Sequence, residues 1–372
     1  MSLQKEIDEM AKVIRADKYP MSIGEMVSIY KEGDIDVHPE FQRIFRWDIA
    51  QKSNLIESIL LGIPIPEIFV SQNELGVWDV IDGQQRLSTI FEFIGILKNE
   101  SKEVMPVSKL TKTKFLPSLE GKLWEGENDG DSLTEAQRRF IKRAKLDITI
   151  IDKSSDQDVK YELFQRLNTG GSRLSPQEVR NCLLVMINEK LYATFRDLKD
   201  NENFSNCIPL GDNSIDQQSD MELIVRYFIA RNSDIKAIKS EGNIHEYLTD
   251  QIVKIAKDVD CDLEEDKNDF IRTFIYLNSL LGEDSFKRYN ESKKKFEGPV
   301  LVSAFEVIVL GLSRNLDKWT SKRKEQVIEL IKSIYTHSVY VDNIKRGVRP
   351  TSRFRNLLLL SLELFADENK IT

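Results

Sequence analysis

The chain has 372 residues, of which 41% are hydrophobic and 31% charged, and it carries a formal net charge of −8. This length allows two domains with separate cores, and the composition argues against an intrinsically disordered protein. The acidic balance argues against indiscriminate coating of nucleic acid, but it is compatible with a local basic groove.

The cysteine pattern and the apolar segments indicate the compartment. Cys182, Cys207 and Cys261 are far apart and form no CxxC pair, so neither a zinc knuckle nor a disulfide framework is expected. The N-terminus has no signal-peptide core, and no apolar run approaches the length of a membrane span. We therefore expect a soluble, cytoplasmic protein without a membrane partner.

The N-terminal part of the chain alternates helix and strand signals. The patterns predict helices over 22–31 and 49–61, ended by glycines, and strands at 35–37, 67–71 and 76–81. Between the first strand and the second helix, arginines alternate with aromatic residues over 41–47. This alternation fits either contact with phosphates and bases or a set of aromatic core anchors whose arginines reach solvent.

The stretch from Val80 to Ile90 carries the clearest signal of a site. An apolar strand leads to Asp82-Gly83, and a helical pattern follows from Gln84 to Leu97. Asp82 can cap this helix, and Gly83 lets the backbone turn and approach a ligand closely. The first helical turn favours an anion, and Arg86 presents a planar fork to a phosphate. The stretch has two interpretations. It is either a site that binds a phosphate or a nucleotide, or it is an ordinary capped helix whose arginine is solvated.

Irregular sequence over 98–131 predicts an excursion over the surface, and order returns with a capping box at Ser132–Glu135. The helix that follows, to about residue 142, is basic, so it presents either a solvated face or a DNA-binding one. Its candidate DNA-binding residues are Arg138, Arg139 and Arg143. Alternating β-branched residues over 145–151 predict a strand.

A second informative block runs from residue 157 to the helix that starts at Ser175-Pro176. A helix over 157–167 and a glycine-rich loop over 169–173 would bring Arg166, Asn168 and backbone N–H groups toward a ligand. The alternative is a structural helix hairpin. The loop matches neither the P-loop nor the dinucleotide-binding glycine pattern.

The character of the chain changes after residue 195. Residues 200–216 are polar and loop-like, and helical periodicity then predominates. The predicted helices are 220–231, 243–257, 265–281, 299–314, 320–337 and 352–366. We therefore predict two domains, 1–195 and 196–372, of which the second is all-helical. Its basic run of Lys345, Arg346 and Arg349 either grips nucleic-acid phosphates or surrounds the last helix.

Five short motifs follow one another in the first half of the chain. They are Phe41-Gln42-Arg43 with Trp47, Leu61–Pro66, Asp82–Arg86, Phe164-x-Arg166-x-Asn168 and Leu174-Ser175-x-x-Glu178. In this order they resemble the N-terminal domain of the GmrSD-type restriction family, which is described by its DGQQR signature, over about residues 20–190. The resemblance implies an α+β fold of the ParB/sulfiredoxin-like superfamily, with a small mixed sheet and helices. It also implies nucleotide binding and hydrolysis at the DGQQR corner, coupled to recognition or restriction of modified phage DNA.

The resemblance also directs attention to nuclease activity. Family members often carry a second domain with an HNH nuclease, which needs clustered His and Asn to hold a divalent metal. Residues 200–372 contain only His245 and His337, far apart, so no HNH nuclease is expected there. Either a partner effector cuts DNA, or this chain senses without cutting, or the ParB-like domain itself nicks DNA.

The roles of individual residues are hypotheses that rest on these motifs and on the chemistry of the side chains. The candidate catalytic residues are Asp82, Gln84, Gln85 and Arg86, and the candidate nucleotide-binding residues are Gln42, Arg43, Gly83, Arg86, Arg166 and Asn168. The expected cofactor is a nucleoside triphosphate, with Mg²⁺ as a candidate metal. Asp82 would hold a metal-bound water or cap the helix, and Gln84 or Gln85 would orient the attacking water.

Two functional hypotheses result. The first is a nucleotide-hydrolysing module of an anti-phage system, and the second is a non-catalytic nucleotide or DNA sensor that uses the same pocket. The expected partners are a nucleotide and DNA, with an effector protein and a second copy of the chain as further candidates.

Overall fold

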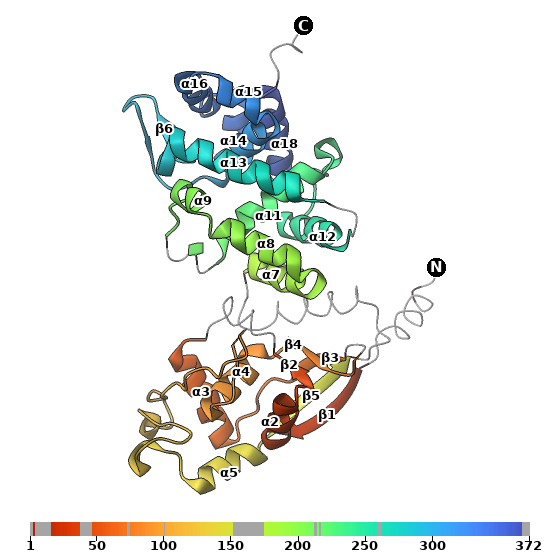
Figure 1. The fold of residues 1–372 in the computed structure, drawn as a ribbon, viewed down its shortest axis with the longest axis vertical. Helices are drawn as coiled ribbons and strands as arrows, with labels where there is room; N and C mark the ends of the chain where they lie inside the picture. The colour runs from red at the N-terminus through yellow and green to blue at the C-terminus, as the bar shows by residue number, and fades with distance from the viewer. Residues whose placement is uncertain are drawn as a thin grey trace. The chain divides into compact units, whose positions relative to one another are not determined.

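The structure is a computed structural model that describes Leu3 and residues 16–37, 47–72, 75–99, 101–151, 175–211, 214–215, 217–258 and 262–366. The chain divides into two compact units, Met1–Arg173 and Leu174–Thr372 (Figure 1). This boundary lies before the predicted change at residue 195. Helix α7 (Pro176–Ile187) lies in the second unit because it packs against α11 (Ser219–Asn232) and α12 (Ile244–Lys257).

The first unit is built on a five-stranded mixed sheet with the strand order β1-β5-β3-β4-β2. The strands are β1 (Ala16–Ser22), β2 (Ile35–Asp36), β3 (Ile68–Gln72), β4 (Trp78–Asp82) and β5 (Lys145–Ile151). Strand β5 pairs antiparallel with β1 and parallel with β3, while β4 pairs antiparallel with β3 and parallel with β2. The predicted small mixed sheet with helices is thereby confirmed. The edge strand β1 was not predicted, because its Ala-Asp-Lys-Tyr-Pro sequence shows no apolar alternation.

Four helices that the structure describes in this unit start and stop on local signals. They are α2 (Ile23–Glu32), α3 (Ile49–Leu61), α4 (Gln84–Ile94) and α5 (Glu135–Arg143). Helix α4 ends before the predicted Leu97 because Gly95 takes the left-handed conformation of a helix end. The capping box of α5 is formed by Thr134 and Gln137, not by Ser132 and Glu135, so the helix starts later than its predicted cap implied.

The excursion over 98–131 is attached to the core of the first unit. Leu110, Leu119 and Trp124 are buried in the same apolar cluster as the sheet and helices. The buried carboxylate of Glu57 on α3 accepts hydrogen bonds from the Thr113 hydroxyl and from two backbone N–H groups, those of Phe115 and Leu116. One acidic side chain therefore fixes the loop against the helix.

The second unit is mostly helical, as predicted. The other α-helices that the structure describes in full in this unit are α8 (Glu189–Lys199), α9 (Glu202–Cys207), α13 (Glu264–Leu280), α14 (Val302–Arg314), α15 (Leu316–Ser321), α16 (Lys324–Ile334), α17 (Ser338–Asn343) and α18 (Pro350–Leu364). Helix α9 corrects the predicted loop at 200–216: Asn201 caps it, and Phe204 and Cys207 are buried. The predicted helix at 320–337 is interrupted at Lys322-Arg323, where extended backbone ends α15 and begins α16.

A β-hairpin also interrupts this helical unit. Strands β6 (Arg288–Asn290) and β7 (Lys295–Glu297) pair antiparallel, and Figure 1 shows the hairpin extending from the helices. The strands are too short for the alternation of apolar and polar residues to be recognised in the sequence.

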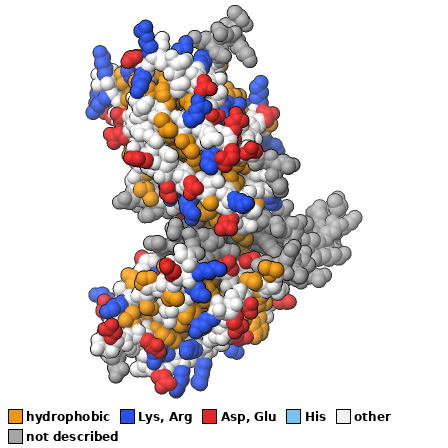
Figure 2. Space-filling model, viewed as in Figure 1, with side chains coloured by type: hydrophobic (Ala, Val, Ile, Leu, Met, Phe, Trp, Pro, Cys, Tyr) orange, Lys and Arg blue, Asp and Glu red, His pale blue; other side chains and the backbone are white. Residues whose placement is uncertain are grey.

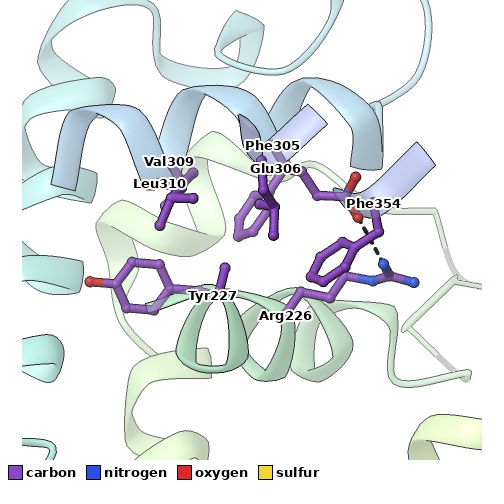
Figure 3. Close-up of a pocket in the computed structure, with 9 residues that line it drawn as sticks. Arg226, Tyr227, Phe305, Glu306, Val309, Leu310 and Phe354 are labelled. Carbon is purple, nitrogen blue, oxygen red and sulfur yellow. Dashed lines mark hydrogen bonds and ion pairs between the residues drawn. The ribbon is translucent and has the colours of Figure 1, made fainter. Parts of the chain in front are cut away.

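The interior of the second unit contains a chain of charges. Arg180 on α7 binds Glu222, Glu222 binds Arg226, and Arg226 binds Glu306 on α14. In Figure 3, Arg226 and Glu306 point toward one another beside the ring of Phe354. A cavity of about 10 Å³ adjoins this pair, room for about one water molecule.

Among the helices that the structure describes, none has both the length and the apolar character needed to cross a bilayer.

Candidate functional site at the β4–α4 corner

The corner between β4 and α4 is formed by a left-handed glycine. Strand β4 continues through Asp82, and Gly83, with φ at 97°, is the N-cap of α4. No described side chain caps the helix. The prediction that Asp82 caps α4 is therefore wrong, because the chain turns one residue later and Asp82 remains the last residue of the strand.

The Asp82 carboxylate instead faces Arg86, one helical turn further on. Nη2 of Arg86 lies 2.7 Å from Oδ2 of Asp82, and Nη1 of Arg86 donates to the Pro66 carbonyl at 2.7 Å. Arg86 is only 8% exposed, so it is not the solvated arginine of the alternative interpretation. Its guanidinium fork ties the start of α4 to the end of β4 and to the segment before β3.

The packing around Gly83 leaves no space for a side chain. A Cβ atom built on Gly83 would lie 2.3 Å from Cδ1 of Ile68 and 3.3 Å from Nη2 of Arg86. Glycine is therefore required both for the positive φ and for the close approach of β3 and α4.

The two glutamines of the corner bind backbone groups of the preceding segment. Nε2 of Gln84 donates to the Val37 carbonyl at 3.0 Å, and Oε1 of Gln85 accepts from the Trp47 N–H at 3.1 Å. Val37 and Trp47 flank residues 38–46, so the first two residues of α4 hold both ends of the segment that contains the Phe-Gln-Arg motif.

The structure describes some of the predicted site residues and not others. Gln42, Arg43, Arg166 and Asn168 lie outside the described residues. Asp82, Gly83, Gln84, Gln85 and Arg86 are brought together at the corner. The backbone groups that bind these side chains were not predicted, since a carbonyl or an N–H group carries no sequence signature of its own.

The basic helix α5 leads to the same end of the sheet as the corner. Phe69 pairs with Asp82 across the antiparallel strands, and Ile68 pairs with Ile148 across the parallel ones. The start of β5, directly after α5, therefore lies at the end of the sheet where β4 runs into α4. A carboxylate at this end, Glu67, binds the Thr149 hydroxyl and Lys18, and these contacts lower its pKa against the effect of burial.

The three arginines of α5 have different surroundings. Arg138 is half-buried and donates to the Glu125 carboxylate and, at 3.5 Å, to the Trp124 carbonyl. Arg139 pairs with Glu135 on the helix surface, and Arg143 is exposed at the end of the helix. Arg139 and Arg143 both line a surface hollow on α5.

The second basic run lies in the turn between α17 and α18, in the second unit. Lys345 pairs with Asp342 at 2.7 Å, and Arg349 lies 3.6 Å from Glu241. Arg346 is exposed in the same turn. Both ion pairs are themselves exposed, so they leave these basic side chains at the surface.

Within the described part of the chain, no three His, Cys, Asp or Glu side chains gather as a metal-binding group. At the corner, the partly exposed carboxylate of Asp82 is the group suited to a metal that also binds phosphate oxygens.

Two strongly perturbed ionisable groups of the second unit, Arg180 and Glu306, belong to its charge chain. Burial lowers the pKa of Arg180 to about 10, and burial raises the pKa of Glu306 against the attraction of Arg226. These groups bind one another, so their shifted pKa values indicate a structural network rather than a catalytic site.

A comparison with known protein families finds a similarity over much of the first unit and the start of the second. Residues 23–185 match the family described as GmrSD restriction endonuclease, N-terminal domain. The matched range starts at the first residue of α2, includes the β4–α4 corner and ends within α7. No curated protein and no solved structure matches the chain.

Proposed function

We propose, from the premise that residues 23–185 are a GmrSD-type N-terminal domain, that the chain is the nucleotide-dependent module of a restriction system. A domain of this family makes the chain a component of a restriction or anti-phage system that acts on DNA. The proposal adds that the β4–α4 corner binds and hydrolyses a nucleoside triphosphate and that DNA is bound by basic surfaces of the chain.

The observation that carries the proposal is the start of α4 at Gly83, beside the Asp82–Arg86 pair. No described side chain caps this helix start, and the N-terminus of a helix favours an anion such as phosphate. The partly exposed carboxylate of Asp82 lies directly before Gly83 in the chain. A positive helix end and a carboxylate in one corner are what binding of a metal-bound phosphate requires.

The contacts at the corner divide the roles among its residues. Arg86 fixes Asp82 through their ion pair, so we assign it a positioning role in addition to its charge. Gln84 and Gln85 hold the two ends of segment 38–46. This segment contains Gln42 and Arg43, whose side chains would also contact the phosphates. Arg166 and Asn168 would close the site. A bound Mg²⁺ would neutralise charge on the phosphates, with Asp82 as its protein ligand.

The test is phosphate release from ATP, GTP and CTP by the full chain, with and without modified and unmodified DNA. Because Arg86 is buried and also holds the Pro66 carbonyl, the informative variant is Asp82→Asn, which keeps the shape of the side chain. We expect Asp82→Asn to lower the rate of release about 100-fold or more, since the carboxylate would be lost from the phosphate site. The control is Asp147→Asn, an exposed acid at the same end of the sheet, and it should leave the rate unchanged.

Two outcomes would contradict hydrolysis at this corner. One is release by Asp82→Asn at the rate of the unaltered chain. The other is nucleotide binding without any release, which would favour the non-catalytic sensor.

A further inference from the structure

Helix α5 presents an outward stripe with an aromatic side chain at its centre. The stripe consists of Ala136, Arg139, Phe140, Arg143 and Ala144, which follow the three- and four-residue spacing of one helix face. These residues line an open hollow on the surface of the first unit. Phe140 is 51% exposed, although a phenylalanine at a helix centre usually packs into the core.

The other large side chains of α5 contact the core or the excursion over 98–131, so they do not cover the stripe. Ile141 points into the core of the first unit. Arg138 binds Glu125, and the Lys142 ammonium lies over the Trp124 ring at 5.8 Å. The helix thus separates its basic residues into two that support the excursion and two that flank Phe140.

The charge of the stripe is positive. Helix α5 carries four basic residues and one acidic residue in a chain whose net charge is negative. Glu135, the acidic residue, pairs with Arg139 on the surface, and a pair this exposed is readily exchanged for another anion. Figure 2 shows Lys and Arg side chains standing out at the edge of the first unit over α5.

We propose that the outward stripe of α5 binds an unpaired strand of DNA, with a base stacked on Phe140 and the flanking phosphates held by Arg139 and Arg143. An exposed ring between two guanidinium groups is the combination by which proteins bind single strands without reading their sequence. In a duplex the base faces are covered by their neighbours, so Phe140 has a surface to contact only where a base is unpaired. The proposal rests on the DNA-binding part of the proposed function. It differs from the predicted set of DNA contacts in that Phe140 contacts the DNA and Arg138 does not.

Helix α5 places this surface at the same end of the sheet as the β4–α4 corner. The helix passes directly into β5, whose start lies at the same end of the sheet as Gly83. A strand bound on α5 would therefore be held at the end of the domain where the nucleotide is expected. No contact between the two sites is required for the strand to bind.

The experiment measures binding of a fluorescein-labelled 20-nucleotide dT strand, and of a duplex of the same length, to the full chain by fluorescence anisotropy. We expect the unaltered chain to prefer the single strand. Phe140→Ala should weaken that binding by about 5- to 100-fold, the loss expected for one stacked base, and Phe140→Trp should retain it. Phe115→Ala is the matched control, because Phe115 is also an exposed aromatic of the first unit, with Lys114 over its ring, and it should bind as the unaltered chain does.

The charged part of the surface is tested by the salt dependence of binding. Replacing Arg139 and Arg143 by Gln should reduce the slope of log affinity against log salt by about 0.7 for each phosphate that is no longer bound. The same two replacements should leave the preference for the single strand in place, since the ring remains.

Three results would overturn the inference: single-strand binding by Phe140→Ala that equals the unaltered chain, equal affinity for the duplex, and no binding of the strand at all. Phosphate release, measured on the same samples, separates this failure from that of the proposed function. If nucleotide is hydrolysed and Phe140→Ala binds the strand normally, only the role of α5 is wrong. If Phe140→Ala loses the strand while the unaltered chain releases no phosphate, the role of α5 stands and hydrolysis is wrong.

Discussion

Position 83 requires glycine both for its backbone conformation and for lack of space beside it. A second glycine of the same unit allows these two effects to be measured separately. Gly83 and Gly33 both have φ values in the left-handed region, at 97° and 86°. A Cβ on Gly33 would meet no atom within 4 Å, whereas one on Gly83 would collide with Ile68. Only the corner glycine therefore combines backbone strain with a steric conflict.

We expect Gly33→Ala to lower the free energy of unfolding by about 1 kcal/mol, the cost of a left-handed alanine. Gly83→Ala should cost about 3 kcal/mol, because displacement of Ile68 adds to the same strain. Urea unfolding of both variants measures the difference. Equal losses would mean that β3 and α4 move apart without resistance and that the close approach at Gly83 has no role.

At the scale of elements, the excursion over 98–131 depends on one carboxylate of α3. Burial acts to raise the pKa of Glu57, but the hydrogen bonds from Thr113, Phe115 and Leu116 outweigh burial and lower the pKa. A carboxyl group whose pKa is lower in the folded state stabilises the fold above its unfolded pKa, about 4.3. That stabilisation is lost as the pH falls through the folded value.

The prediction concerns the difference in unfolding free energy between the unaltered chain and Glu57→Gln. This difference should be largest near pH 6 and should shrink as the pH falls below about 4, because protonated Glu57 and glutamine then resemble each other. Urea unfolding at a series of pH values measures it. Glu127→Gln, an exposed glutamate of the same excursion, should show no such trend. A difference that stays constant with pH would show that Glu57 does not fix the loop through its charge.

At the scale of the whole molecule, the two units are stabilised differently. The first unit has an apolar core with the sheet at its centre. The second unit places charged side chains in its interior, where Arg226 lies between Glu222 and Glu306. Burial acts to lower the pKa of Arg226 and to raise that of Glu222, but the surrounding opposite charges prevail and shift both pKa values toward the charged forms.

Removing one member of this chain leaves an uncompensated buried charge. Glu306→Ala should therefore lower the free energy of unfolding by about 3–5 kcal/mol. Hydrogen exchange read by mass spectrometry should show faster exchange in α11 and α14, with the strands β3 and β5 unaffected. The double variant Arg226→Met with Glu306→Leu should recover much of the loss, because it removes both charges and fills the space. If Glu306→Ala were as stable as the unaltered chain, Glu222 alone would suffice to balance the charge of Arg226.

Much of the architecture could be predicted because it depends on neighbours in the sequence. Helices α2 and α3 are capped by Ser22 and Asp48 and end before left-handed glycines, and α7 starts after the expected cap at Ser175. The elements that were missed, such as β1 and the β6–β7 hairpin, depend on pairing with a distant or very short partner strand. Their polar sequences give no periodic signal, and only the partner makes a strand of them.

The order of amino acids alone specifies where the corner of the first unit lies. A strand, a turn glycine and a helix are local features, and the periodicity of apolar residues together with the choice of turn residue encodes them. What the side chains of that corner contact is set only in three dimensions. Asp82 turns from the helix start to Arg86, Arg86 reaches the Pro66 carbonyl, and Gln84 and Gln85 bind Val37 and Trp47. These partners lie up to 47 residues away. No local pattern encodes such contacts, since they exist only after the sheet has brought the segments together.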